Sequence, residues 1–361
     1  MWIMRAMNGT KGRGFRGSVS GAWQQNRRKR FIMQRLLFDE PGLVKESAKP
    51  PRTQLLKWIG NKQRFARRIV SFFPDDFGTF YEPFLGSGAV LATLAKEASV
   101  GADSFKPLIE IWQTLARSPA TLQQWYAERW HSVMSGDKRA GYEAVKASYN
   151  ASPNAADLLF LCRSCYGGVV RFRQADGHMS TPCGIHNPIS PEAFARRVSE
   201  WHRRIKGAKF VHAEYADTMS LARSGDLVYC DPPYSHTQSI LYGAQSFSLD
   251  HLLGVIADCK SRGVFVALSI DGLKQSGKLN CQLPHREGLF EREVFLDCGR
   301  SMLKRFQMNG LSLEDEVVHD RLLLTYSPPG FNFRTMRVIA ISSPRGGDRG
   351  AGRSWAFSQS S

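Results

Sequence analysis

The segment of the chain with the strongest chemical signal is residues 227–234, which read Leu-Val-Tyr-Cys-Asp-Pro-Pro-Tyr. We expect an apolar strand that ends at the carboxylate of Asp231, with Pro232, Pro233 and Tyr234 directly after it. Prolines stiffen a turn and carry no amide hydrogen, so their carbonyl oxygens remain available as acceptors. Two rigid acceptors beside an aromatic ring suit a planar ligand that bears an amino group. The alternative is a simple proline-rich turn that begins with an aspartate.

A second segment, residues 81–90, places two glycines where an expected strand gives way to a helix. It reads Tyr-Glu-Pro-Phe-Leu-Gly-Ser-Gly-Ala-Val, with glycine at 86 and 88. Glycine lets the backbone turn tightly and approach a ligand closely, beside the N-terminus of the helix that follows. A Gly-x-Gly turn is often only a turn, so this segment needs support from other parts of the chain.

The elements that would position both segments follow an α/β pattern. Strands are expected near residues 79–84, 226–230, 263–270, 291–296 and 321–326, and helices at 62–73, 89–98, 105–115 and 191–206. Between residues 104 and 207 amphipathic helices predominate, and an apolar stripe marks the last of them. The members of this stripe are Phe194, Val198, Trp201 and Ile205. We therefore expect one α/β domain interrupted by a helical insertion, with ligands bound at the carboxyl ends of its strands.

The charge of the chain is strongly positive and unevenly distributed. The formal net charge is +17 over 361 residues, and residues 1–32 carry eight basic side chains and no acidic one. A basic arm on a basic body suggests a polyanionic partner, most often nucleic acid, although a solvated basic surface is the alternative. The chain has seven cysteines, no secretory signal and no apolar run near the ~20 residues that span a bilayer. These features favour a reduced, cytoplasmic protein without a membrane partner.

Three motifs in a fixed order resemble the Dam-type DNA adenine-N6 methyltransferases, the alpha group of the D12 class. They are Leu-Lys-Trp-Ile-Gly-Asn-Lys at 56–62, Glu-Pro-Phe-Leu-Gly-Ser-Gly at 82–88 and Asp-Pro-Pro-Tyr at 231–234. The resemblance covers about residues 55–326. It implies an α/β fold, a Rossmann-like S-adenosylmethionine-dependent methyltransferase sheet with a helical target-recognition insertion. It also implies site-specific methyl transfer from S-adenosylmethionine to the N6 amino group of a flipped-out adenine in double-stranded DNA.

The resemblance assigns roles to the residues at matching positions. The cofactor-binding residues would be Trp58, Lys62, Glu82, Phe84, Gly86, Gly88, Asp103 and Asp231, and the catalytic residues Asp231, Pro232, Pro233 and Tyr234. Asp103 would accept hydrogen bonds from a ribose diol, or instead cap the helix that follows it. Asp231 and the Pro232 carbonyl would accept the two amino hydrogens of adenine, and Tyr234 would stack on the extruded base. Asn61 departs from the second glycine that is usual in the family.

Target recognition is implied for residues 161–172 and 181–184. By position, Arg163, Arg171 and Pro182 would contact DNA, and Arg171 matches an arginine that reads guanine in GATC enzymes. A phosphate contact is the alternative for Arg171. Gly167 stands where an asparagine is usual, and Ile185-His186 replaces an Arg-aromatic pair. The DNA sequence that is recognised therefore remains open.

A Cys-x-x-Cys pair at 162 and 165 raises the question of a metal site. No second pair with suitable spacing completes the four ligands of a structural zinc site, so we expect no metal. Cys162 lies in an apolar helical stretch and is expected in the core, as is Trp201.

These observations divide the chain and define its expected partners. We expect residues 1–51 to form a basic, flexible N-terminal arm, 52–104 and 208–343 the catalytic domain, 105–207 the helical DNA target-recognition insertion, and 344–361 a flexible tail. Double-stranded DNA is the expected partner, with a cognate restriction endonuclease as a second candidate, in a bacterial or phage-infected cell. Two other functions stay open: the same fold acting on an RNA adenine or a cytosine N4 group, and a catalytically idle DNA-binding protein.

Overall fold

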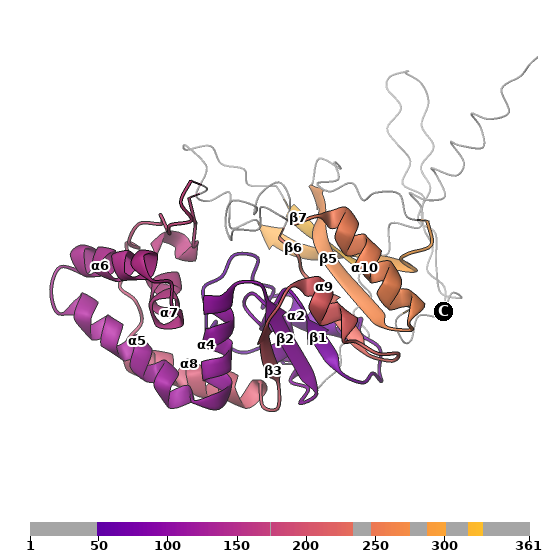
Figure 1. Cartoon of the computed structure of the whole chain (residues 1–361), viewed down its shortest axis with the longest axis horizontal. Helices are drawn as coiled ribbons and strands as arrows, with labels where there is room; N and C mark the ends of the chain where they lie inside the picture. Colours follow the sequence, from indigo (N-terminus) through magenta and orange to yellow (C-terminus); the bar gives the residue numbers. More distant parts are fainter. Residues whose placement is uncertain (1–48, 174, 234–246, 275–286, 301–316, 328–361) are drawn as a thin grey trace, which may run out of the picture. The chain divides into compact units, whose positions relative to one another are not determined.

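The computed structural model describes residues 49–173, 175–233, 247–274, 287–300 and 317–327 (Figure 1). Nearly all of the predicted arm, the whole predicted tail and Tyr234 lie outside these ranges. The described residues of the predicted catalytic domain and of the predicted insertion pack as one compact unit.

Within the described residues, seven strands form one sheet in the order β3-β2-β1-β4-β5-β7-β6. The strands are β1 (Phe80–Glu82), β2 (Ser99–Asp103), β3 (Lys209–His212), β4 (Leu227–Cys230), β5 (Phe265–Lys274), β6 (Arg292–Arg300) and β7 (Val317–Leu324). The first five strands in this order are parallel, whereas β7 runs antiparallel to both β5 and β6. The chain moves outward from β1 to β3 and then returns to β4. The gap between the carboxyl ends of β1 and β4 is therefore the switch point at which open sheets bind ligands.

Both faces of the sheet are buried, which confirms the predicted Rossmann-like α/β fold. Along β4, Leu227 and Tyr229 belong to one hydrophobic core, and Val228 and Cys230 belong to the other. Helices α2 (Ala66–Ser71) and α3 (Ala89–Leu94) contribute to the first core, and α9 (Tyr215–Ser220) and α10 (Leu249–Ser261) to the second. Burial on both faces explains why the strands read as nearly continuous apolar runs.

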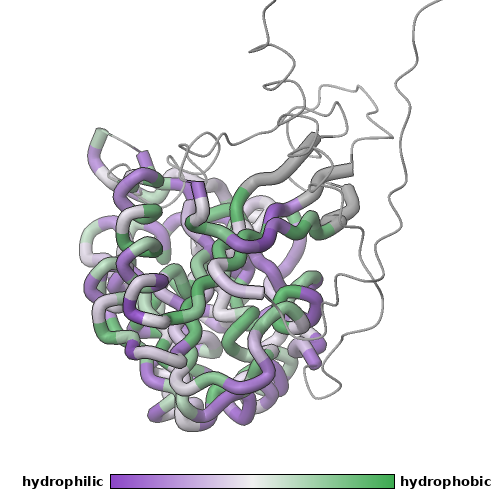
Figure 2. The backbone as a smooth tube through the Cα atoms, turned by 90° about the vertical axis from the view of Figure 1, so that its right-hand side faces the viewer, coloured by the Kyte–Doolittle hydropathy of each residue, from purple (hydrophilic) through white to green (hydrophobic). Residues whose placement is uncertain are grey.

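The stretch between β2 and β3 is mainly helical, as the sequence predicted. It consists of α4 (Lys106–Arg117), α5 (Pro119–Met134), α6 (Lys138–Ala151), α7 (Ala155–Ser164), a short 3-10 turn η1 (Tyr166–Gly168) and α8 (Pro191–Arg204). In Figure 1, α4 lies between the sheet and the other helices, and it packs against both β3 and α7. The predicted stripe on α8 is buried, as expected for a core-facing side. Figure 2 shows hydrophobic and hydrophilic residues interspersed along the described backbone.

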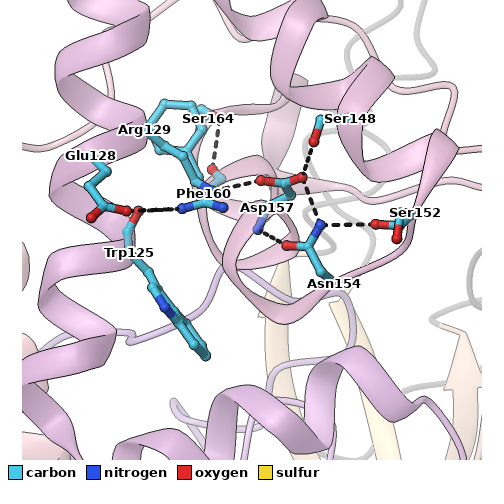
Figure 3. A network of polar contacts seen from close by, with 9 residues as sticks. All are labelled: Trp125, Glu128, Arg129, Ser148, Ser152, Asn154, Asp157, Phe160 and Ser164. Atoms are coloured by element: carbon cyan, nitrogen blue, oxygen red, sulfur yellow. Dashed lines mark hydrogen bonds and ion pairs between the residues drawn. The ribbon is translucent and has the colours of Figure 1, made fainter.

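A polar network fixes three helices of the insertion against one another (Figure 3). Asp157 on α7 is 3% exposed, and its carboxylate accepts hydrogen bonds from Arg129 on α5, Ser148 on α6 and Asn154. The Asn154 side chain in turn accepts from the Asp157 backbone N–H at 2.8 Å and so caps α7. Because every partner of this buried carboxylate is a donor, the hydrogen bonds offset the cost of removing its charge from water and join the three helices.

Two helices are shorter than predicted. The helix expected over residues 62–73 begins only at Ala66, because the Asn61 side chain accepts the Gln63 N–H at 2.8 Å and holds a local turn instead. The helix expected over residues 89–98 ends at Leu94, since Ala95 adopts a left-handed conformation with φ of 51°. Both ends depend on local backbone geometry, which apolar periodicity does not report.

Candidate active site

A cavity of about 370 Å³ lies beside the carboxyl ends of β1, β2 and β4. Of the residues predicted for the site, Trp58, Lys62, Glu82, Phe84, Gly86, Asp103, Asp231 and Pro233 line it. Gly88 lies outside the lining as the N-cap of α3, and Pro232 is buried. Segments far apart in the sequence therefore meet at the switch point of the sheet.

The glycine turn is shaped by its two glycines. Gly86 and Gly88 have φ values of +46° and +60°, which residues other than glycine rarely adopt. A Cβ on Gly86 would approach the Trp58 ring to 3.2 Å, and one on Gly88 would meet Trp112 at 3.0 Å. The indole N–H of Trp112 also donates to the Gly86 carbonyl at 3.2 Å. Two tryptophans thus hold the turn at the cavity wall.

Asp103 ends β2 and connects the glycine turn to the start of α4. Its two carboxylate oxygens accept the Gly86 N–H at 3.1 Å and the Phe105 N–H at 3.0 Å. Burial raises the pKa of this carboxyl to about 6, although both N–H groups favour the ionised form. Asp103 is not the N-cap of α4, because Phe105 holds that position and no side chain caps it. The capping role considered from the sequence is thus only partly realised, through the Phe105 N–H.

Glu82 ends β1 and is 3% exposed. One of its carboxylate oxygens accepts the backbone N–H of Leu91, in the first turn of α3, at 2.9 Å. Burial raises the pKa of Glu82 well above its usual range, and the nearby Asp231 carboxylate adds to the shift. Glu82 therefore holds α3 in place from the floor of the cavity, a contact that motif matching does not predict.

Lys62 and Asp231 form a buried ion pair with a third member. The Lys62 ammonium lies 3.2 Å from Asp231 Oδ1 and 2.8 Å from Asp320 Oδ2. Asp320 lies on β7, and sequence reasoning gave it no role. The available signal in the sequence is an acidic residue two positions before the apolar run 322–324. Lys62, which the resemblance assigns to the cofactor, is paired here with two carboxylates at the cavity wall.

Aromatic side chains that were not predicted for the site complete the cavity. Tyr215 stacks on Phe84 with ring centroids 5.0 Å apart, and Phe247 packs edge-on against Phe84 at 6.0 Å. Phe105 packs at 6.3 Å from Trp58. All five rings line the cavity. Planar apolar walls beside carboxylates suit a ligand that combines an aromatic ring with polar hydroxyl or amino groups.

The segments predicted to contact DNA pair with each other in space. Antiparallel bridges join Cys165 to Cys183 and Phe172 to Met179. Arg171 and Pro182 are exposed on this paired structure. The accessibility of both side chains agrees with their predicted contact with DNA, which stays a prediction.

The placement of Arg163 corrects its predicted role. The side chain is 4% exposed, and its guanidinium donates to the carbonyl oxygens of Gln54 and Leu55 at 3.1 and 2.6 Å. The prediction that Arg163 contacts DNA is therefore wrong, because a buried guanidinium bound to backbone cannot reach a DNA strand. Arg163 instead fixes the segment that leads to Trp58.

Both members of the cysteine pair, Cys162 and Cys165, lie in the hydrophobic core. Cys162 is fully buried, and burial raises its pKa to about 12, which confirms the predicted packing role. No group of three or more potential metal ligands occurs among the described residues. No helix in the described part of the chain is long and apolar enough to cross a membrane.

The strand order and the cavity at the switch point define a Rossmann-like α/β fold with a candidate ligand site. Residues 58–278 match the family model of the D12 class N6 adenine-specific DNA methyltransferases, and the chain belongs to this family. It is similar to the Retron Ec67 DNA adenine methylase of Escherichia coli, with 28% identity over 68% of this chain and 87% of that protein. The family and this relative identify the chain as a DNA adenine-N6 methyltransferase, in agreement with the prediction.

Two further relatives extend the comparison. The DNA N-6-adenine-methyltransferase of Escherichia phage P1 is 28% identical over 77% of this chain and 36% of that longer protein. The type II methyltransferase M1.LlaDCHI of Lactococcus lactis subsp. cremoris is 26% identical over 59% of this chain and 79% of that protein. The family match favours DNA adenine over the RNA and cytosine alternatives.

Proposed function

We propose that the chain methylates the N6 amino group of a flipped-out adenine in double-stranded DNA and uses S-adenosylmethionine as the donor. The observation that carries this proposal is the meeting of Asp103, the glycine turn and Asp231 in one cavity, contributed by β2, β1 and β4. The ends of β2 and β4 each supply a carboxylate, and the turn after β1 supplies backbone that a ligand can approach closely.

The cavity fits the proposed donor through its acceptors and rings. Each Asp103 oxygen accepts one backbone N–H and has a second lone pair for a ribose hydroxyl. Trp58 and Phe84 offer apolar faces for a purine ring. When bound, S-adenosylmethionine supplies an electrophilic methyl group. The chain's own residues then have to present the acceptor nitrogen in line with that methyl group.

The adenine amino nitrogen is a poor nucleophile, because its lone pair is delocalised into the ring. Acceptors for its two hydrogens favour the geometry in which the lone pair faces the methyl group. We assign these acceptors to the Asp231 carboxylate and the Pro232 carbonyl, with Pro233 keeping the turn rigid. As positive charge builds on the nitrogen, the Asp231 carboxylate stabilises it. Tyr234 is assigned to stacking on the extruded base, which a duplex would otherwise hide from the enzyme.

On the DNA side, we assign contacts to Arg171 and Pro182. Arginine forms bidentate hydrogen bonds with guanine, and exposure leaves the Arg171 side chain able to make them. The basic composition supports affinity for the phosphate backbone. The type II name of the Lactococcus relative supports a cognate restriction endonuclease as a partner, and the bacterial and phage relatives support action in a bacterial cytoplasm.

The experiment that tests the proposal is modified-base sequencing of a plasmid that carries the gene, compared with the same plasmid encoding Asp231→Ala. The wild-type plasmid is expected to contain N6-methyladenine in one recurrent context. In Asp231→Ala, Lys62 keeps Asp320 as a partner, so the variant is expected to fold. Its single-turnover transfer rate should fall by about 100-fold or more, while DNA affinity changes little.

Three outcomes would contradict this proposal. Methylcytosine as the sole product, or methylation confined to RNA, would exclude the proposed substrate. A folded Asp231→Ala protein that transfers methyl groups at nearly the wild-type rate would exclude the role assigned to the carboxylate. A thermal melt and a DNA-binding titration on the same preparation separate loss of chemistry from loss of fold.

A further inference from the structure

One lysine at the cavity wall serves two carboxylates from distant parts of the chain. Lys62 comes from the loop before α2, Asp231 follows β4, and Asp320 lies on β7. The ammonium nitrogen is 3.2 Å from Asp231 Oδ1 and 2.8 Å from Asp320 Oδ2. The shorter contact is therefore to the carboxylate that the proposed reaction does not use.

Burial makes this arrangement energetically demanding. The side chains of Lys62 and Asp320 are 7% and 10% exposed, and that of Asp231 is 17% exposed. A buried charge without a partner is strongly destabilising, so each member depends on the others. With one ammonium and two carboxylates, the three groups carry a formal net charge of −1.

Asp320 is the only one of the three residues that lies in a strand. It occupies an interior strand of the sheet and pairs with Asp271 on β5 and Leu296 on β6. Lys62 and Asp231, in contrast, lie in segments outside the strands. A contact from a strand can therefore fix the lysine, and through it the loop carboxylate.

We propose that Asp320 is a positioning residue that holds the Lys62 ammonium and thereby orients Asp231 toward the target amino group. Asp320 does not line the cavity, so it acts through Lys62. Its negative charge has a second effect: it offsets the ammonium, so that Asp231 keeps its full strength as an acceptor when the nitrogen becomes positive. This inference rests on the proposed role of Asp231.

The test is single-turnover transfer of a labelled methyl group by Asp320→Asn, a substitution of the same shape without the charge. The transfer rate is expected to fall about 10- to 100-fold, while the dissociation constants for DNA and for S-adenosylmethionine change less than threefold. Asp320→Glu keeps the charge and is expected to retain more of the rate than Asp320→Asn. The opposite order would overturn the proposal, even if both variants are less stable.

A double-mutant cycle tests the route through Lys62. In a Lys62→Met background, Asp320→Asn is expected to change the rate less than twofold, because the connecting ammonium is gone. An undiminished effect in that background would overturn the proposed route. If Asp320→Asn in the otherwise wild-type chain keeps the wild-type transfer rate and only lowers the melting temperature, Asp320 has a structural role alone.

The matched control is Glu293→Gln. Glu293 on β6 forms a 2.7 Å ion pair with Arg321, the residue next to Asp320 on β7. The side chain of Arg321 is 3% exposed. Breaking that pair should lower the melting temperature and leave the transfer rate within twofold of wild type.

Asp231→Ala in the same assay distinguishes a failure of the role proposed for Asp320 from a failure of the role proposed for Asp231. If Asp231→Ala lowers the transfer rate by about 100-fold or more while Asp320→Asn leaves it at the wild-type value, only the role of Asp320 is wrong. If Asp231→Ala retains the wild-type rate, the role of Asp231 is wrong and that of Asp320 falls with it.

Discussion

At the scale of single residues, Asp103 is under two opposing influences. Burial disfavours its charge and raises its pKa to about 6, whereas the Gly86 and Phe105 N–H groups favour the ionised form. The Glu214 carboxylate raises this pKa further, and His212 lowers it. The ionised form is the one that can accept hydrogen bonds from two ribose hydroxyls. The proposed donor should therefore bind to a group that titrates close to neutral pH.

We predict that the affinity for S-adenosylmethionine falls as the pH drops below about 6. Protonation removes acceptor capacity from Asp103, so the dissociation constant should rise by up to about tenfold per pH unit for one proton. Calorimetric titrations between pH 5 and 8 measure this dependence. Asp103→Asn should bind S-adenosylmethionine weakly, and its affinity should no longer fall at acidic pH; this fall is called the acidic limb below.

Glu82→Gln is the control for the pH experiment. Glu82 lines the same cavity and also has a raised pKa, and glutamine can still accept the Leu91 N–H. This variant should keep the acidic limb. If the limb disappears in Glu82→Gln and persists in Asp103→Asn, the titrating group is Glu82 and the role assigned to Asp103 is wrong.

At the scale of elements, the sequence predicted what periodicity and short motifs encode. The α8 stripe, the strand before Asp231 and the glycine turn after β1 all lie where they were expected. These features depend on neighbours along the chain, through the 3.6-residue helix period or a local turn. The end of α3 was wrong, because no periodicity reports that Ala95 adopts a left-handed conformation.

The partners of Lys62 could not be predicted in the same way. Asp320 lies 258 residues further along the chain, and only the sheet order β4-β5-β7 brings its strand near Asp231. The DNA contact predicted for Arg163 was wrong for a related reason. Its motif position matched, but Arg163 is only 4% exposed, because its guanidinium binds the backbone carbonyls of residues 54 and 55. Pairings over such distances follow from tertiary topology, which one sequence does not specify.

We predict that Ala95→Gly stabilises the protein. Ala95 is exposed and has φ of 51°, and a non-glycine residue pays about 1 kcal/mol for that conformation. Part of the gain is offset because glycine is more flexible in the unfolded chain. The net increase in the free energy of unfolding should be about 0.5 kcal/mol, measured by urea denaturation.

Ala92→Gly provides the opposite expectation within the same helix. Ala92 is buried and its N–H donates to the Gly88 carbonyl at 3.0 Å, so glycine there should destabilise the protein by about 1 kcal/mol. If Ala95→Gly also destabilises, the left-handed conformation does not determine where α3 ends.

At the scale of the whole molecule, charge and specificity have different sources. The formal net charge of +17 acts on any phosphate backbone, irrespective of base sequence. Base reading requires side chains placed at a groove by rigid elements. Arg171 is exposed on the paired segments after α7, and we propose that it reads a base. Residues 1–32, in contrast, contribute eight basic side chains whose sequence carries no motif for reading bases.

We predict that a chain starting at Met33 keeps the site preference of the full chain but binds DNA with a weaker dependence on salt. Each phosphate contact that is lost should reduce the slope of log K against log salt concentration by about 0.9, since fewer counterions are released. Binding titrations at several salt concentrations, with modified-base sequencing of both proteins, measure the two properties separately. Arg171→Ala in the full chain is the matched comparison, and it should weaken the site preference while changing the slope by about one contact or less. A truncated enzyme that methylates a different sequence would show that the arm reads bases, and the division between charge and specificity would then be wrong.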